Sequence, residues 1–294
     1  MKLALKIDVD TYRGTRDGVP RLVRLLQLHE VGATFLFSLG PDHTGRAIRR
    51  VFRPGFFSKV KRTSVLEHYG LKTLLYGTLL AGPDIGRRCA GEMRAVKAAG
   101  FEVGVHCWDH VRWQDNAVRE DGDWTERDMQ RAFNRFKEVF GSDCSIHGAA
   151  GWQLNRHAAW FEERHCSYAS DTRGTEPFRP LWDGVAIGCP QLPTTLPTLD
   201  ELMGVDGTDE RNVAARILEM TKEKKDHVFT AHAELEGGEW HGIFDTLLRG
   251  WREQGYELVS LKDLHDSLDL ASLPRNEVVQ GTVPGRSGTL AIQA

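Results

Sequence analysis

The stretch LALKIDVDTYRG, residues 3–14, begins with a short apolar run and then carries two aspartates, Asp8 and Asp10, one residue apart. The apolar run predicts a buried β-strand. Residues i and i+2 of an extended strand lie on one face, so the two carboxylates would lie side by side. Such a pair needs a nearby cation or a shared proton, unless the two residues form a solvated turn after the strand. These residues alone leave both possibilities open.

Outward from this strand, short apolar runs alternate with amphipathic stretches along most of the chain. We expect strands at 3–7, 33–38, 101–105, 143–148, 166–170, 227–232 and 256–260. The intervening helices are expected at 19–32, 83–100, 123–141, 155–164, 208–225 and 240–255. Repeated strand–helix alternation predicts an α/β fold with a parallel sheet, either open or closed into a barrel.

The alternation predicts a single domain at residues 1–270, followed by a C-terminal tail at 271–294. Two long connections interrupt it, a basic one at about 41–82 and a Pro/Gly-rich one at about 172–207. Long connections within a compact domain are usually either functional or disordered. Both are therefore expected to be inserts in one domain.

The composition is typical of a globular protein, with 40% hydrophobic residues, 27% charged residues and a formal net charge of −3. No apolar run of about 18 residues occurs, so we expect no transmembrane helix. The N-terminal residues lack the apolar region and cleavage site of a signal peptide. The five cysteines include no Cys-x-x-Cys pair, which favours free thiols in a reducing compartment. We therefore expect a cytoplasmic location.

The stretch VGVHCWDH, residues 103–110, contains two histidines four residues apart, His106 and His110. If the chain turns helical there, both imidazoles share one face and can bind the same metal ion. The glutamate that follows the first histidine in metalloproteases is absent here. Histidines that only pack or cap a helix are the alternative for this pair.

Polar residues follow four of the expected strands at the point where each ends: Asp8 with Asp10, His106, Asp171 and His232. The carboxyl ends of parallel strands meet at one edge of a sheet, and active sites of α/β folds collect there. One aspartate with two histidines would make a metal site with open positions for water and substrate. The other aspartate would then act as general base, and His232 would protonate a leaving amine.

Three motifs carry a resemblance to a known family: IDVDT (7–11), HCWDH (106–110) and FTAHAE (229–234). The chain resembles the polysaccharide deacetylases (NodB-homology, carbohydrate esterase family 4). The resemblance implies a distorted, incomplete (β/α) barrel. It also implies that Asp8 is the catalytic base, that His232 is the acid, and that one divalent metal ion is bound by Asp10, His106 and His110. Zinc, cobalt and manganese all suit this ligand set.

Further blocks narrow the resemblance to one branch of that family. They are IDVDTYRGTRDGVPRL (7–22), GVHCWDHVRWQ (104–114), AAGWQ (149–153), SDTRGTEPFRPL (170–181), QLPTTLPTLDEL (191–202) and HAELEGG (232–238). Members of this branch remove the formyl group from 4-deoxy-4-formamido-L-arabinose linked to undecaprenyl phosphate. The resemblance therefore implies this lipid-linked formamido sugar as substrate. It also implies a role in lipid A modification and in resistance to polymyxin and other cationic peptides.

One departure from the wider family concerns the catalytic base. Most members carry an Arg-x-Pro segment that orients it, but the corresponding stretch here is HGAAGWQ (147–153). Arg13 and Arg173 are candidates for that role, although binding of phosphate or a surface position is an alternative for each. We expect the substrate to be bound by Arg13, Asp171, Arg173 and Arg179.

The segment RAIRRVFRPGFFSKVKR, residues 46–62, contains seven Arg or Lys residues and no acidic residue. Its interleaved apolar side chains are typical of a segment that binds an anionic membrane surface. The expected membrane contacts are Arg49, Arg50, Phe52, Arg53, Phe56, Phe57 and Lys59. We therefore expect a peripheral protein on the inner face of the inner membrane. A basic helix packed on its own domain is the alternative, and binding of nucleic acid is not expected.

Two other functions remain open from the sequence. One is N-deacetylation of another glycan, which would require neither a membrane nor the basic segment. The other is a non-catalytic protein that binds the lipid carrier. A binding protein needs no complete set of base, acid and metal ligands, so the five motif residues favour an enzyme.

Overall fold

The computed structural model describes residues 1–47 and 72–294. Its centre is a curled, seven-stranded parallel sheet with the order β5-β4-β3-β2-β1-β8, in which β9 also pairs with β1. The strands are β1 (Lys2–Val9), β2 (Thr34–Ser38), β3 (Glu102–Cys107), β4 (Ile146–His147), β5 (Tyr168–Ala169), β8 (His227–His232) and β9 (Glu257–Val259). The predicted α/β fold is confirmed, and the sheet is an incomplete barrel.

Strand β1 forms the middle of the core. It pairs in parallel with β2 on one side and with β8 on the other, and residues 3–9 are all buried. Strands buried on both faces are near-continuous apolar runs, which is why this stretch is so apolar. Lys6 and Asp8 are the two charged residues within it, and both are buried.

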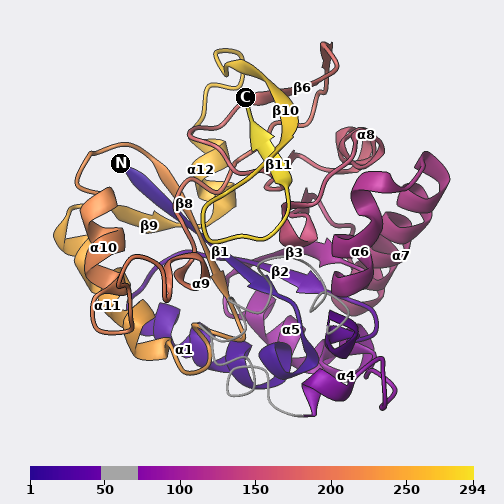
Figure 1. The fold of residues 1–294 in the computed structure, drawn as a ribbon, viewed down its shortest axis with the longest axis horizontal. Helices are drawn as coiled ribbons and strands as arrows, with labels where there is room; N and C mark the ends of the chain where they lie inside the picture. Colours follow the sequence, from indigo (N-terminus) through magenta and orange to yellow (C-terminus); the bar gives the residue numbers. More distant parts are fainter. Residues whose placement is uncertain (48–71) are drawn as a thin grey trace.

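Helices surround the sheet on its outer side. Figure 1 shows β1 crossing the middle of the molecule, with α6 and α7 on one flank and α10 and α11 on the other. The helices are α1 (Val19–Leu28), α4 (Ile85–Arg88), α5 (Ala90–Ala98), α6 (His110–Asn116), α7 (Gly122–Phe140), α8 (Arg156–His165), α9 (Leu199–Leu202), α10 (Val213–Met220), α11 (His241–Glu253) and α12 (Leu261–Asp266). The single helix expected at 83–100 is divided at Cys89 into α4 and α5.

A smaller sheet covers one end of the barrel (Figure 1). Its order is β11-β10-β6-β7, with β6 (Arg179–Trp182), β7 (Val185–Ala186), β10 (Arg275–Gly281) and β11 (Leu290–Gln293). The residues treated as a tail, 271–294, therefore contain two regular strands that pair with the Pro/Gly-rich insert. Val278, Leu290 and Ala291 are buried there, so these strands gain the apolar packing that a free tail lacks.

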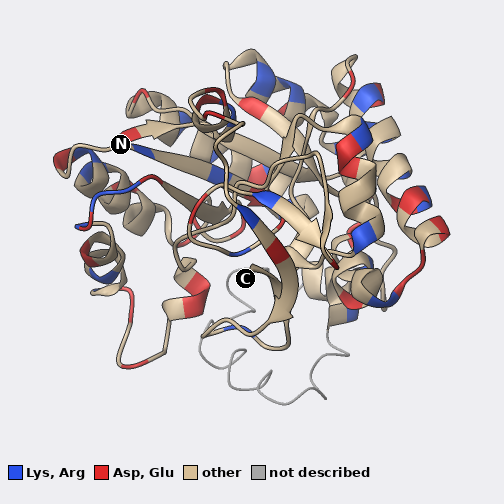
Figure 2. Ribbon diagram, turned by 90° about the horizontal axis from the view of Figure 1, so that it is seen from above, with Lys and Arg blue, Asp and Glu red and all other residues tan. Residues whose placement is uncertain are grey.

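Charged residues of both signs are interspersed over the outer helices of the described part of the chain (Figure 2). No helix within residues 1–47 and 72–294 is long and apolar enough to cross a membrane.

Candidate active site

The register of β1 and β8 makes Asp8 and His232 direct neighbours. They are Cα partners across this parallel pair, and the backbone N–H of Ala233 donates to the Asp8 carbonyl at 2.9 Å. Adjacent strands lie about 4.8 Å apart, so two distant motifs meet at one edge of the sheet. The predicted base and acid therefore lie side by side.

Three residues converge just beyond this edge. His106 is the next-to-last residue of β3 and His110 begins α6, so a strand-to-helix turn joins them. Asp109 in that turn caps α6 by accepting from the N–H of Arg112. We expected both histidines on one helical face, but the turn brings them together instead. One Asp10 oxygen lies 3.2 Å from His106 Nε2, and its other oxygen lies 3.3 Å from His110 Nε2.

The donor set of this group fits a divalent cation. His106 Nδ1 lies 2.6 Å from the Gly148 carbonyl oxygen. Because a carbonyl only accepts, Nδ1 carries the hydrogen and Nε2 keeps its lone pair for a metal. Asp10 Oδ1 is buried without a hydrogen-bond partner, which is the expected state of a carboxylate oxygen whose partner is a metal ion. One ligand atom from each of the three residues lies within 4.8 Å of the others.

The electrostatics of Asp10 favour its ionised form. Burial raises its pKa, but the electrostatic interaction with the neighbouring rings of His110 and His106 outweighs burial and lowers the pKa below its ordinary value. A carboxylate that stays charged in a buried site is suited to bind a metal ion.

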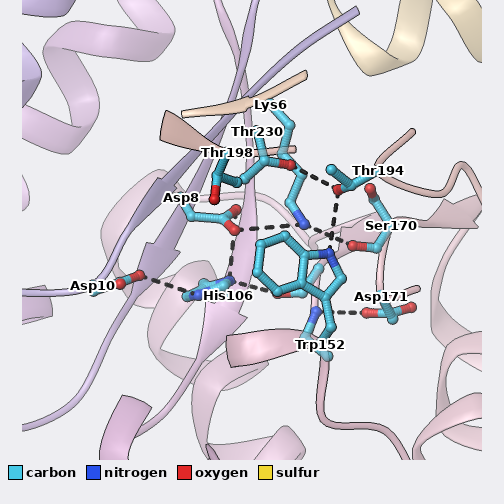
Figure 3. Close-up of polar contacts among 12 residues, drawn as sticks. Lys6, Asp8, Asp10, His106, Trp152, Ser170, Asp171, Thr194, Thr198 and Thr230 are labelled. Atoms are coloured by element: carbon cyan, nitrogen blue, oxygen red, sulfur yellow. Dashed lines mark hydrogen bonds and ion pairs between the residues drawn. The ribbon is translucent and has the colours of Figure 1, made fainter. Parts of the chain in front are cut away.

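Asp8 lies beside this group and is only 3% exposed. Its Oδ2 is 3.5 Å from the ammonium of Lys6, and its Oδ1 is 3.8 Å from His106 Nδ1. Figure 3 shows Asp8 between Lys6 and His106, with Asp10 on the far side of His106. The sequence prediction omitted Lys6, although a lysine two residues before Asp8 lies on the same face of a strand.

The loop after β8 contacts the backbone of both Asp10 and His232. One Glu234 oxygen accepts from the backbone N–H groups of Asp10 and Thr11, at 3.1 and 2.8 Å. Burial and then the charge of Asp10 raise the pKa of Glu234 well above its ordinary value. The backbone N–H of His232 donates to Glu236 Oε2 at 2.7 Å. Both glutamates lie in the HAELEGG block, but no spacing rule pointed to their contacts.

His232 presents its ring at the site with its Nδ1 buried and without a hydrogen-bond partner. The ring of Trp152 lies edge-on to it at 6.5 Å between centroids. Trp152 has a φ of 53°, which is rare for a residue with a large side chain and is typical of functional sites. The segment that departs from the family pattern therefore supplies a wall of the site.

Asp171 does not join this group. It is fully buried in a second cluster, with its Oδ1 at 3.0 Å from His147 Nδ1 and its Oδ2 accepting from Gln191 at 2.7 Å. Glu162 lies on the same His147 nitrogen at 2.7 Å. Burial lowers the pKa of His147, but the two carboxylates outweigh it and raise the pKa to about 10. Asp171 is thus part of a buried network of charged side chains and is not exposed at the surface of the site.

The arginines expected to bind substrate lie in different surroundings. Arg173 is 8% exposed, donates to Glu201 at 2.5 Å and stacks 5.0 Å from the centroid of Trp152. Arg179 lies in β6 and donates to the Leu270 carbonyl at 3.2 Å. Arg13 is half-buried immediately before a short π-helix at Gly14–Gly18, in the loop that follows Asp10.

The expected membrane contacts lie outside the described residues. They are Arg49, Arg50, Phe52, Arg53, Phe56, Phe57 and Lys59. Their role stays a prediction from the sequence.

The buried Glu236 predicts a pH dependence of stability. Burial raises its pKa to about 8, so between about 4.5 and 8 the folded state binds more protons than the unfolded state. Its contribution to the free energy of unfolding is therefore complete below pH 4.5 and is lost as the pH rises to 8. We expect Glu236→Gln to lose less stability than the parent protein between pH 5 and 8. Urea unfolding of the metal-free proteins measures this, and equal losses would contradict it.

No protein-family model matches the chain. It is 36% identical over 294 residues, all of this chain and 95% of the relative, to "Probable 4-deoxy-4-formamido-L-arabinose-phosphoundecaprenol deformylase ArnD" of Shewanella sediminis (strain HAW-EB3). A protein of the same name from Wigglesworthia glossinidia brevipalpis is 30% identical over 282 residues, 95% of this chain and 98% of the relative.

Three solved structures share the fold at low identity. A putative polysaccharide deacetylase from Mycobacterium smegmatis has a TM-score of 0.63 at 16% identity, over 96% of this chain and 94% of that one. A CE4 family pseudoenzyme from Bacillus anthracis has a TM-score of 0.54 at 14% identity, over 94% and 69%. A family 4 acetyl xylan esterase from Clostridium thermocellum, solved with a cobalt ion, has a TM-score of 0.52 at 12% identity, over 90% and 91%. The chain has the fold of a polysaccharide deacetylase, and its identity to both deformylases extends over nearly their whole length. It therefore belongs to the 4-deoxy-4-formamido-L-arabinose-phosphoundecaprenol deformylase family.

Proposed function

We propose that the protein hydrolyses the formamide bond of 4-deoxy-4-formamido-L-arabinose linked to undecaprenyl phosphate. The products are formate and the free amino sugar on its lipid carrier. The observation that carries this proposal is the Asp10–His106–His110 group beside Asp8 and His232. The names of the two relatives support the substrate. The fold alone would not, because one structural neighbour is described as a pseudoenzyme.

Asp10, His106 and His110 would hold one divalent cation, either zinc, cobalt or manganese. When bound, this cation would supply positive charge that polarises the formyl carbonyl and acidifies a nearby water. The rest of the chemistry belongs to two protein side chains. Both lie at the same edge of the sheet as the ligand group.

Asp8 would take a proton from the attacking water as the water oxygen bonds to the formyl carbon. The carbon–nitrogen bond then breaks, and its electron pair stays on the nitrogen. His232 would donate a proton to that nitrogen, so the sugar leaves as an amine and the acyl part leaves as formate. Water is thereby divided between the two products, and no other reactant is needed.

The proposed substrate also indicates a biological role. The amino sugar would be used to modify lipid A, and the modification would give resistance to polymyxin and other cationic peptides. Because each CH₂ moved from the bilayer into water costs roughly 0.8 kcal/mol, the lipid carrier stays in the membrane and the enzyme must come to it. We propose that residues 46–62 bind the anionic inner face of the inner membrane, which makes the protein cytoplasmic and peripheral.

Metal content tests the ligand assignment. Because His106 would be a direct ligand, His106→Ala should lower the affinity for Co²⁺ or Zn²⁺ more than tenfold. His157→Ala removes the same side chain from the outer helix α8 and should retain one metal per chain. Metal analysis after dialysis measures both. Full metal content in His106→Ala would refute the assignment.

Turnover tests the reaction and the base. The protein loaded with metal should release formate from a short-chain analogue of the lipid-linked formamido sugar, and should act more slowly on the acetamido analogue. Asp8→Asn should retain the metal but lose roughly 10²–10⁴-fold in kcat, the usual share of a general base. Mass spectrometry of the sugar product measures both results. A preference for the acetamido sugar would contradict deformylation, and near-normal kcat in Asp8→Asn would contradict the role of Asp8.

Vesicle binding tests the proposed membrane segment. Changing Arg49, Arg50, Arg53 and Lys59 to Glu should release the protein from anionic vesicles, because each basic residue near such a surface contributes roughly 1 kcal/mol. The matched control makes the same charge change at exposed positions of the described surface: Arg87, Lys137, Arg211 and Lys222. Sedimentation with vesicles measures both. The proposal fails if both variants bind equally, or if the first loses activity on a water-soluble analogue.

A further inference from the structure

Lys6 is the one lysine among residues 1–47 and 72–294 that is buried, with an exposed fraction of 0%. Its ammonium donates to the Ser170 carbonyl at 2.8 Å and lies 5.4 Å from the centroid of the Trp152 ring. Its third contact is an ion pair with Asp8 Oδ2 at 3.5 Å. Burying an ammonium costs several kcal/mol unless it is paired and hydrogen-bonded. The position of Lys6 therefore depends on these three partners.

We propose that Lys6 is the positioning residue of the catalytic base. This inference rests on the function proposed above, in which Asp8 is that base. Lys6 and Asp8 are two residues apart and lie on the same face of β1, so the strand alone brings their side chains together. The ion pair holds Oδ2 of the carboxylate toward the interior. Oδ1, which is buried without a hydrogen-bond partner, is then turned toward His106 and remains available to accept a proton (Figure 3).

The segment HGAAGWQ, residues 147–153, is shaped to receive this lysine. A Cβ added to Gly148 would lie 2.3 Å from Leu36 Cδ1 and 3.3 Å from Lys6 Cε, so glycine leaves the space in which the lysine stem lies. Trp152 of the same segment covers the ammonium. The segment that lacks the orienting arginine of the wider family thus makes room for a cation from β1.

The two arginines considered for this role have other surroundings. The guanidinium of Arg173 is held by Glu201 and by the Thr194 and Leu196 carbonyls. Arg13 follows Asp10 and lies outside β1. Lys6 touches Asp8 but is fully buried, so it can influence the substrate only through the base.

A double-mutant cycle between Lys6→Met and Asp8→Asn tests the inference, first by thermal unfolding of the metal-free proteins. Lys6→Met alone leaves the Asp8 carboxylate buried without its cation, so Tm should fall. In the Asp8→Asn background the same change removes no ion pair, and Tm should fall less. An equal fall in both backgrounds would overturn the inference. Ile7→Val, on the opposite face of β1, serves as a control and should lower Tm equally in both.

The same cycle is then measured as kinetics of the metal-loaded proteins. Lys6→Met should lower kcat about 10- to 100-fold, as expected when a reacting group is misplaced by about 1 Å. KM and metal content should stay close to their original values, because Lys6 contacts neither substrate nor ligands. In Asp8→Asn, adding Lys6→Met should produce no further loss. Lys6→Arg keeps the cation and should have a higher kcat than Lys6→Met.

Three kinetic results would also overturn the inference: an unchanged kcat in Lys6→Met, an equal loss of kcat in both backgrounds, or a Lys6→Arg variant no faster than Lys6→Met. Failure of the proposed function is a separate outcome. It would be seen as absence of formate release by the unmodified, metal-loaded protein, whereas the unfolding cycle measures the Lys6–Asp8 pair without any substrate.

Discussion

Two neighbouring carboxylates at the end of β1, the buried Asp8 and the largely buried Asp10 one residue beyond the strand, are the constraint on which the site depends. Like charges at this spacing repel, and the low dielectric of the interior increases that repulsion. The structure places different groups opposite each one. Asp8 faces the ammonium of Lys6, and Asp10 faces the two histidines. The two carboxylates are thereby made chemically distinct, one suited to hold a metal and the other to accept a proton.

The parallel pairing of the strands brings other polar residues to these two carboxylates. Because β1 lies between β2 and β8, its carboxyl end meets the ends of its neighbours at one edge. β8 contributes His232 in direct register with Asp8, and the loop after β8 returns Glu234 to the backbone of Asp10. The loop that follows His232 thus also holds the turn that carries Asp10. Displacing β8 would disturb both together.

The sequence predicted residues that lie at the ends of strands. It could not predict residues whose position depends on contacts within the core. Asp8, His106 and His232 were found because polar residues after apolar runs are visible without a structure. The contact of Lys6 with Ser170 joins positions 164 residues apart, and no local pattern reports it. The same limit applies to Asp171, which lies after a strand as expected but turns inward to His147. The strands at 275–281 and 290–293 were treated as tail because their partner, β6, lies in an insert.

Because the cation beside Asp8 is Lys6 of β1, the segment 147–153 need not supply one. A segment that must deliver an arginine to the base is committed to that contact, whereas here it carries small residues and Trp152. The tryptophan packs between the cations of Lys6, Arg173 and Arg286, with centroid distances of 5.4, 5.0 and 4.6 Å. Cations over an aromatic face stabilise it, which offsets the strain of its left-handed backbone. With the cation supplied by β1, the segment can place an aromatic wall beside His232, where the amide nitrogen would leave in the proposed reaction.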